Sequence, residues 1–396
     1  MKIVFLDTTN HASEIGGGHL FLAGIVNELA DRGHDVHVVT KGKPNLQIAE
    51  RIHNSGIQIH IAPWGTGGIV EDVSPNFAAW LNKLSPQVYV ISGSFDIGWT
   101  TLPLIDSGIA TLTIGHNDSE TFYAPVRHYR RFLTRAVGVS DEICETYRND
   151  CGIAADRIEW IPYGVETNEC APDDRSVRPL RLIYVGRLDE EQKRTSDLIK
   201  VVRRLNENGV DFQLSIVGDG EEMPAVREGM SAEIASGRVT LFGWLDSSDV
   251  IEKVRAAEIF VLTSAYEGFC IALVEAMANG CAPLVTDIKS GNKQLVRNGE
   301  NGFVVPIGDI GSFIEKISYL DANRDKLLEF RQKAWETGRE YSVERMVAAY
   351  EGCFETAAAD ARSNPRTPDP GFPLMESCRS KYPLWLRRIK ARLVNS

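Results

Sequence analysis

The sequence lacks any apolar run long enough to cross a bilayer as a helix, which would take about 20 residues. Its seven cysteines are scattered, without a CxxC pair or a spacing typical of metal sites. The apolar stretch at Met1–Leu6 is too short for the core of a secretory signal and is predicted to be a strand. We therefore expect reduced thiols in a cytoplasmic protein.

The chain also lacks a fixed-period repeat and an excess of positive charge. Its formal net charge of −11 disfavours a whole-protein role in binding nucleic acid or an anionic membrane, although a local basic patch is compatible with it. A length of 396 residues is too great for one ordinary core, and a hydrophobic content of 43% is typical of globular proteins. Two domains are therefore predicted.

The first half of the chain alternates short apolar runs with amphipathic stretches. Helical patterns include 19–32 and 76–84, and strands are predicted at 3–6, 36–39, 57–61, 88–91, 110–114 and 136–139. This βα alternation predicts a parallel sheet covered on both faces. The pattern lapses at 161–178, a stretch with Pro, Gly, Asn and Asp that is predicted to be an interdomain linker.

A second βα series follows the linker. Its predicted strands are 182–185, 212–217, 239–241, 259–262, 282–285 and 303–305, with helices at 324–341 and 343–359. The sequence thus predicts an α/β fold with two Rossmann-like, doubly wound domains, at 1–165 and 166–360. Ligands of such sheets bind at the carboxyl ends of the strands.

The most informative stretch is Tyr266–Gly280, which follows the predicted strand at 259–262. A loop with Glu267 leads into a short apolar helix that carries Glu275 and stops near Gly280. The free N–H groups and partial positive charge of a helix N-terminus suit an anion such as a diphosphate. Glu267 is placed to meet what lies beyond that anion, and an ionised Glu275 inside the helix needs a polar partner.

This stretch resembles the Glu-x7-Glu signature of retaining GT-B glycosyltransferases, most closely glycosyltransferase family 4. The resemblance implies that Glu267 lies beside the donor sugar, that Glu275 receives the ribose hydroxyls, and that the backbone of Phe269, Cys270 and Ile271 contacts the diphosphate. The family often has glycine at the position of Cys270, a change that a backbone contact tolerates. The implied fold is GT-B, two domains facing a cleft, with the acceptor mainly in the first domain and the donor in the second.

Residues 182–194 run from a strand into a charged loop. Arg187 and Lys193 could reach one anion, since arginine suits the forked oxygens of a phosphate and lysine acts as a point charge. The segment resembles the family's Gly-Arg-Leu…Lys element, which implies that Arg187 and Lys193 neutralise the donor diphosphate. Arg194, beside Lys193, is the alternative side chain for this role.

Glycine-containing turns after other predicted strands also match the family. By resemblance, Gly218 lies beside the nucleotide, and the turn with Gly243 and Trp244 lines the base pocket, although either turn taken alone is equally well a structural one. Gly16 and Gly17 belong to a glycine-rich loop before a helix, which in the family approaches the donor phosphate or the acceptor.

His116 follows the predicted strand at 110–114 and matches the family's histidine beside the donor sugar. Residues 290–294 depart from the family, which often has Gly-x-Pro-Glu there, so the resemblance does not define the donor sugar.

The sequence therefore predicts a retaining glycosyltransferase that moves a sugar from a nucleoside-diphosphate sugar, with UDP favoured, to a carbohydrate, lipid-linked or small-molecule acceptor. The catalytic set is Glu267, His116, Arg187 and Lys193. No Asp-x-Asp metal motif is seen where the donor should bind, so we expect neither a metal nor another cofactor. A nucleotide-sugar epimerase, a phosphorylase and a non-catalytic nucleotide-sugar-binding protein are the alternatives.

The carboxyl-terminal part, 361–396, has a different composition. A Pro-rich, linker-like run at 363–370 precedes 384–394, which has the pattern of a short basic amphipathic helix. In the family such a helix often returns to the first domain. The alternative is peripheral contact with an anionic membrane on the cytoplasmic side, which would suit a lipid-linked acceptor.

Overall fold

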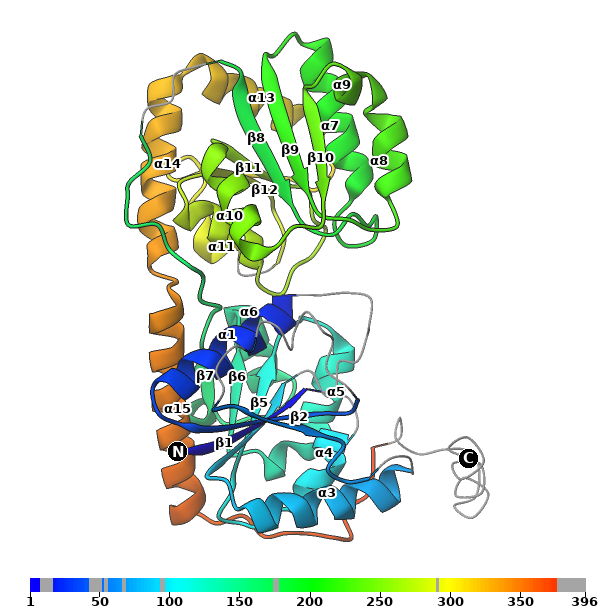
Figure 1. Ribbon diagram of the computed structural model, residues 1–396, viewed down its shortest axis with the longest axis vertical. Coiled ribbons are helices and arrows are strands. Elements are labelled where there is room, and N and C mark those ends of the chain that lie inside the picture. The colour runs from blue at the N-terminus through cyan, green and yellow to red at the C-terminus, as the bar shows by residue number, and fades with distance from the viewer. Residues whose placement is uncertain are drawn as a thin grey trace. The chain divides into compact units, whose positions relative to one another are not determined.

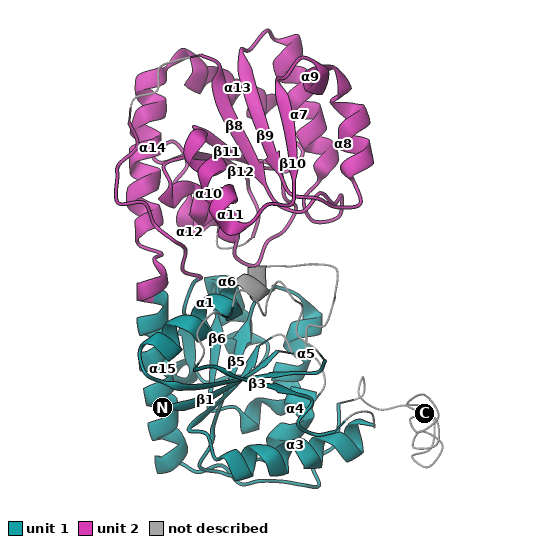
Figure 2. Ribbon diagram, in the orientation of Figure 1, with its two compact units in different colours: residues 1–162, 346–396 teal, residues 163–345 magenta. Residues whose placement is uncertain are grey.

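The computed structural model describes residues 1–7, 17–42, 52, 56–65, 69–92, 97–173, 178–289 and 292–375, with the backbone alone for 17–20 (Figure 1). The chain forms two compact units (Figure 2). Unit 1 consists of residues 1–162 and 346–396, and unit 2 of residues 163–345.

Unit 1 is built on one parallel sheet. Within the described residues its strand order is β3-β2-β1-β4-β5-β6-β7, and every adjacent pair is parallel. The elements are β1 (Lys2–Asp7), α1 (Gly17–Asp31), β2 (Asp35–Thr40), β3 (Gln58–Ile61), α3 (Val70–Leu84), β4 (Val88–Ser92), α4 (Ile97–Thr101), β5 (Ala110–Gly115), α5 (Glu120–Tyr129), β6 (Arg135–Gly138), α6 (Asp141–Asn149) and β7 (Ile158–Trp160), with 3-10 turns at Leu102–Leu104, Arg130–Phe132 and Ala155–Arg157.

Unit 2 repeats this plan. Its sheet has the order β10-β9-β8-β11-β12-β13 in the described part of the chain, again with parallel neighbours. The elements are β8 (Leu180–Val185), α7 (Thr195–Glu207), β9 (Phe212–Val217), α8 (Met223–Gly229), α9 (Ser231–Ala235), β10 (Val239–Gly243), α10 (Ser247–Ala256), β11 (Ile259–Leu262), α11 (Ile271–Ala278), β12 (Ala282–Thr286), α12 (Asn292–Leu295), β13 (Phe303–Val305), α13 (Ile310–Ala322) and α14 (Arg324–Arg339).

Both doubly wound sheets confirm the predicted fold class, and each predicted strand overlaps an observed one. The inner strands β4, β5, β11 and β12 are buried on both faces, which explains why they stand out as continuous apolar runs rather than alternating ones. The edge strand β3 is mostly exposed. Strand β7 was not predicted, because three residues at a sheet edge, with Trp160 43% exposed, carry too little pattern.

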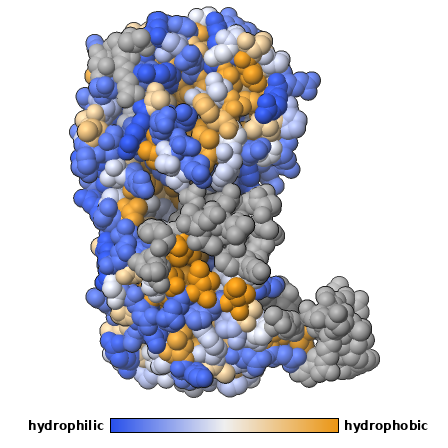
Figure 3. Space-filling view, in the orientation of Figure 1, coloured by the Kyte–Doolittle hydropathy of each residue, from blue (hydrophilic) through white to orange (hydrophobic). Residues whose placement is uncertain are grey.

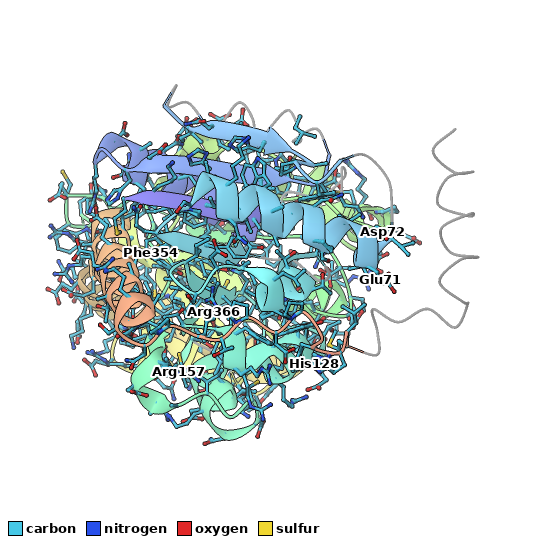
Figure 4. All side chains as sticks on the ribbon, turned by 90° about the horizontal axis from the view of Figure 1, so that it is seen from below. Glu71, Asp72, His128, Arg157, Phe354 and Arg366 are labelled. Atoms are coloured by element: carbon cyan, nitrogen blue, oxygen red, sulfur yellow. The ribbon has the colours of Figure 1, made fainter. Side chains whose placement is uncertain are left out.

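The long helix α15 (Val343–Ser363) begins in unit 2, and from Met346 onward it belongs to unit 1. Its apolar stripe packs there, with the ring of Phe354 6.1 Å from that of Phe5 on β1 (Figure 4). An ion pair of 2.6 Å between Glu351 and Arg32 adds to this contact. The domain boundary expected at 360 therefore differs from the observed division, since a helical pattern does not reveal which sheet the helix covers.

Residues 364–375, expected to be linker-like up to 370, lie against unit 1. The Arg366 guanidinium donates to Thr111 Oγ1 at 2.6 Å and to the carbonyl of Asp106 at 3.0 Å (Figure 4). The ring of Phe372 packs against Phe132, with centroids 4.9 Å apart, and Asp369 pairs with Arg131. The predicted basic helix at 384–394 lies outside the described residues.

The surface that Figure 3 presents is mostly hydrophilic, with scattered apolar areas in both units. Large hydrophobic side chains that are more than a third exposed include Trp244 and Tyr266. None of the described helices combines the length and apolar character that a membrane span requires. Trp244 and Tyr266 both belong to loops that follow strands of the unit 2 sheet.

Candidate functional site

The candidate site lies where the strand order of the unit 2 sheet reverses. From β8 the chain moves outward through β9 and β10, and it then returns to place β11 on the other side of β8. Loops at the carboxyl ends of the two strands beside such a switch point diverge and leave room for a ligand. The two loops are tied together, since the Ala265 N–H donates to the Gln192 carbonyl at 2.7 Å and Thr263 Oγ1 donates to the Lys193 carbonyl at 2.8 Å.

The centre of this region is an ion pair between Lys193, after β8, and Glu267, after β11. Lys193 Nζ lies 2.6 Å from Glu267 Oε1, and the two side chains are only 12% and 6% exposed. Burial alone would lower the pKa of Lys193, but the adjacent Glu267 carboxylate outweighs it and the pKa is raised. Arg194 is directed elsewhere, with its Nε 2.6 Å from Asp197 Oδ2, so Lys193 is the cation at this carboxylate.

Two further donors hold Glu267 in place. Ser264 Oγ donates to Oε1 at 2.6 Å, and Gln192 Nε2 donates to Oε2 at 3.2 Å. A carboxylate offers about four acceptor positions. Among the described residues, Lys193, Ser264 and Gln192 fill three of them. The acceptor position that remains is on Oε2.

Arg187 lies at the start of the loop after β8. Its Nε donates to Asp189 Oδ2 at 3.0 Å and its Nη2 donates to Gln192 Oε1 at 3.1 Å. Asp189 also accepts the backbone N–H of Gln192 at 2.7 Å, so the carboxylate fixes both the loop and the arginine. The Arg187 side chain as a whole is 46% exposed.

Helix α11 begins at Ile271, four residues after Glu267, with Cys270 as the N-cap residue and no side-chain cap among the described residues. The N–H groups of Leu273 and Val274 donate to the Cys270 carbonyl, whereas those of Ile271 and Ala272 have no recorded partner in the described part of the chain. Ile271 and Ala272 are partly exposed. This N-terminus therefore offers free donors and a partial positive charge to an anion.

The side chains of the preceding residues are part of the core. The ring of Phe269 packs between those of Tyr163 and Tyr341, at 5.8 and 5.9 Å, so its backbone is the part left for a ligand. Burial, and then the Glu267 carboxylate, raise the pKa of the Cys270 thiol to about 12. A thiol of this kind is inert, and Cys270 thus supplies backbone rather than side-chain chemistry.

Glu275 lies within α11 and is half-buried. Burial, followed by repulsion from Glu166, raises its pKa from 4.5 to about 7. Among the described residues its carboxylate has no recorded hydrogen bond, although its backbone carbonyl accepts from Asn279. A costly carboxylate without a protein partner is typical of a group kept for a ligand.

Three glycines form adjoining turns at the ends of β8, β9 and β10. The Gly218 N–H donates to the Gly243 carbonyl at 2.7 Å, and a Cβ on Gly218 would lie 1.9 Å from the Gly186 carbonyl oxygen. Trp244, next to Gly243, is 47% exposed. On the other side, the Lys193 side chain passes 3.6 Å from the position of a Cβ on Gly186. The turns at Gly186 and Gly218 therefore pack too closely for a side chain at Gly218.

Gly218→Ala is expected to destabilise the protein by at least about 2 kcal/mol, because it combines a backbone clash with a φ of +132°. Gly209→Ala is the matched control, since Gly209 also has positive φ, +69°, but a Cβ there meets nothing within 4 Å. Urea unfolding of both variants provides the comparison. Equal stability of the two would show that the close approach at Gly218 is unimportant.

The remaining predicted residues lie in unit 1. His116 follows β5, its Nε2 lies 2.9 Å from Ser92 Oγ, and its ring packs at 5.3 Å from that of Phe21. Ser92 ends β4, which with β1 flanks the switch point of the unit 1 sheet. Gly17 is the first residue of α1, and Gly16 lies outside the described residues.

The structure brings Arg187, Lys193, Glu267, Glu275 and the α11 N-terminus to one unit. Asp189, Gln192 and Ser264 also belong to the site, although no motif in the sequence marks them as site residues. The position of Ser264 could have indicated a site residue, because it is polar, directly follows a buried strand and precedes Glu267 by three positions. The roles of Asp189 and Gln192 depend on loop geometry that the pattern does not contain.

Comparisons with known proteins give consistent matches along the chain. The family model described as Glycosyltransferase Family 4 matches residues 15–169, and the one described as Glycosyl transferases group 1 matches residues 172–340. The lipopolysaccharide 1,6-galactosyltransferase of Salmonella typhimurium is 28% identical over 60% of this chain and 67% of its own length. The Escherichia coli UDP-Gal:alpha-D-GlcNAc-diphosphoundecaprenol alpha-1,3-galactosyltransferase is 30% identical over 50% of this chain, which spans about half, 54%, of that relative.

Solved structures share the fold. Anabaena HepE in complex with UDP superposes with a TM-score of 0.74 at 17% identity, covering 90% of this chain and 100% of that one. At this identity the likeness concerns the architecture, two doubly wound sheets as found here. Since the two family models together match almost all of residues 15–340, the chain belongs to the GT-B glycosyltransferases of family 4.

Proposed function

We propose that this glycosyltransferase moves a sugar from a UDP-sugar to an acceptor hydroxyl, with retention at the anomeric carbon and without a divalent metal. The observation that carries the proposal is the buried Lys193–Glu267 pair at the switch point of unit 2, next to Arg187 and the α11 N-terminus. These groups offer cations and backbone donors for a diphosphate and an acceptor for a sugar.

The first requirement of the reaction is to stabilise the leaving diphosphate. In this proposal Arg187 and Lys193 bind its oxygens, and the N–H groups of Ile271 and Ala272 add to the positive potential. The groups are fixed before reaction by their contacts with Asp189 and Glu267, so little reorganisation accompanies the development of charge. Such fixed charges replace the function that a divalent metal has in other transferases.

Glu267 holds the donor sugar in this scheme. Three protein donors occupy most of its acceptor positions, which suits a group that accepts one sugar hydroxyl better than one that attacks carbon. The bond from the anomeric carbon to the phosphate oxygen breaks, and a bond to the acceptor oxygen forms on the same face. Because attack and departure occur on the same face, the configuration is retained, and the acceptor hydroxyl gives its proton to the leaving phosphate. The contact of His116 with the donor sugar, which the family resemblance implies, is also part of the proposal.

The choice of UDP rests on the relatives. The E. coli relative is named for UDP-Gal, and the Anabaena structure contains UDP. We assign the ribose to Glu275 and the base to the turn with Gly243 and Trp244. Gly218 lies beside the nucleotide in this proposal. The approach to the donor phosphate or the acceptor that the family resemblance implies for Gly16 and Gly17 is also part of the proposal.

The names of the relatives also guide the acceptor. One is named as a lipopolysaccharide galactosyltransferase and the other for an alpha-D-GlcNAc-diphosphoundecaprenol acceptor. We propose a carbohydrate acceptor of this glycoconjugate class, with peripheral membrane contact through residues 384–394 as a further part of the proposal.

Thermal unfolding with UDP, GDP, ADP and dTDP, each with EDTA, tests the donor assignment. Ligand at a hundred times its dissociation constant adds about 2.7 kcal/mol of stability, which gives a clear shift. We expect a shift with UDP and its sugars alone. A shift with another base would correct the nucleotide, a shift only after addition of Mg²⁺ would refute metal independence, and no shift with any donor would refute the site.

A further inference from the structure

Gln192 occupies the position between the two halves of the proposed donor site. Its Oε1 accepts from Arg187 Nη2 at 3.1 Å, and its Nε2 donates to Glu267 Oε2 at 3.2 Å and to the Tyr266 carbonyl at 3.3 Å. A primary amide has both a carbonyl acceptor and N–H donors at one end of a side chain. It therefore satisfies an arginine on one side and a carboxylate on the other.

The backbone at Gln192 is fixed as firmly as its side chain. Its N–H donates to Asp189 Oδ1 at 2.7 Å, and its carbonyl accepts from the Ala265 N–H at 2.7 Å. The first contact ties it to the loop after β8, and the second to the loop after β11. The amide thus has little freedom to leave either neighbour, and a displacement at one end is transmitted to the other.

We propose that Gln192 is a positioning residue that couples the diphosphate contact of Arg187 to the sugar contact of Glu267. The inference rests on the proposed function and adds a role for a residue outside its catalytic set. When a diphosphate binds Arg187, the Gln192 carbonyl keeps the guanidinium oriented and its amide keeps Glu267 Oε2 aimed at the sugar. UDP alone makes only the diphosphate contact with Arg187, whereas a UDP-sugar requires both this contact and the sugar contact with Glu267.

Gln192→Met and Gln192→Glu separate these contributions. Methionine has similar length but neither donor nor acceptor, while glutamate keeps the acceptor for Arg187 and loses the donor to Glu267. We expect Gln192→Met to bind UDP within about threefold of wild type, because Asp189 still holds Arg187 in that variant. Gln192→Glu should bind UDP more weakly, because its added carboxylate lies beside Glu267 and repels the diphosphate. The kcat for sugar transfer, or for slow donor hydrolysis, should fall about 10- to 100-fold, the scale of one hydrogen bond to a charged group.

A double-mutant cycle with Arg187→Lys distinguishes coupling from a merely local effect. The losses in kcat/KM of Gln192→Met and Arg187→Lys should be less than additive, because each breaks the same linkage. The control is Glu191→Gln, an exposed neighbour on the same loop whose side chain has no recorded hydrogen bond among the described residues. Its kinetics should equal those of wild type.

The outcomes are distinguishable. If wild type neither binds UDP nor consumes any sugar nucleotide, the proposed function itself fails. If wild type is active and Gln192→Met behaves like Glu191→Gln, or if its effect is additive with Arg187→Lys, the coupling is refuted while the function stands. A parallel loss of UDP binding and turnover in Gln192→Met would also refute it, since that variant adds no charge and Asp189 still holds Arg187.

Discussion

Lys193→Ala is expected to lower the turnover of sugar transfer by about 10²–10³-fold, the range found when one preorganised donor to a developing anion is removed. The same change leaves Glu267, only 6% exposed, without its cation. Removing one partner of a buried pair typically costs about 3–5 kcal/mol, so the variant should also unfold at lower urea concentration. Steady-state kinetics with a UDP-sugar and urea unfolding measure the two effects.

Arg194→Ala is the control for this experiment, because Arg194 is the adjacent cation and pairs with Asp197 instead of Glu267. Its turnover should equal that of wild type even if it loses some stability. Arg187→Ala should lower turnover by a similar 10²–10³-fold. Wild-type kinetics for Lys193→Ala, or a larger loss for Arg194→Ala, would contradict the assignment of Lys193.

Glu275→Gln is expected to have opposite effects on stability and on ligand binding. Because the pKa of Glu275 in the folded protein, about 7, lies above its ordinary 4.5, the folded state binds the proton more tightly. The free energy of unfolding of wild type therefore falls as pH rises from 4.5 to 7. Glutamine removes this decline, and the gain at pH 8 is at most about 3 kcal/mol, reduced because water reaches the half-buried carboxylate.

The same substitution should weaken UDP binding about 10- to 100-fold, since the ribose hydroxyls lose charge-assisted hydrogen bonds. Urea unfolding at pH 5 and pH 8, with calorimetric titration of UDP at pH 8, measures both effects. Glu166→Gln is the matched control, because Glu166 is exposed and is only the second cause of the raised pKa. A variant that is less stable at pH 8, or that binds UDP like wild type, would show that Glu275 is structural.

The sequence was sufficient for the architecture because the strands of a doubly wound sheet are buried on both faces. Runs such as Ile259–Leu262 are then unmistakable, and the loops that follow them hold the candidate residues. No local pattern in the sequence predicts that β8 and β11 pair in the sheet. This pairing brings Lys193 to Glu267, which is 74 residues away in the sequence.

Side-chain partners were less predictable. The sequence left Lys193 and Arg194 as alternatives, and only the geometry of the loop directs one to Glu267 and the other to Asp197. The sequence around Gln192 does not indicate its role, because that role depends on its hydrogen bonds to Arg187 and to Glu267. The helix α15 was predicted, but its pattern of apolar residues does not indicate which of the two units it packs against.

Hydrogen–deuterium exchange of the wild-type protein with and without saturating UDP, in EDTA, tests the central claim most directly. The N–H groups of Ile271 and Ala272 lack protein partners among the described residues and should exchange quickly in the free protein. The account predicts that UDP slows exchange at 269–273 and in the loop 186–193, with no change in the edge strand β3. Protection elsewhere, or UDP binding that leaves 269–273 unprotected, would contradict a donor site at the switch point of unit 2.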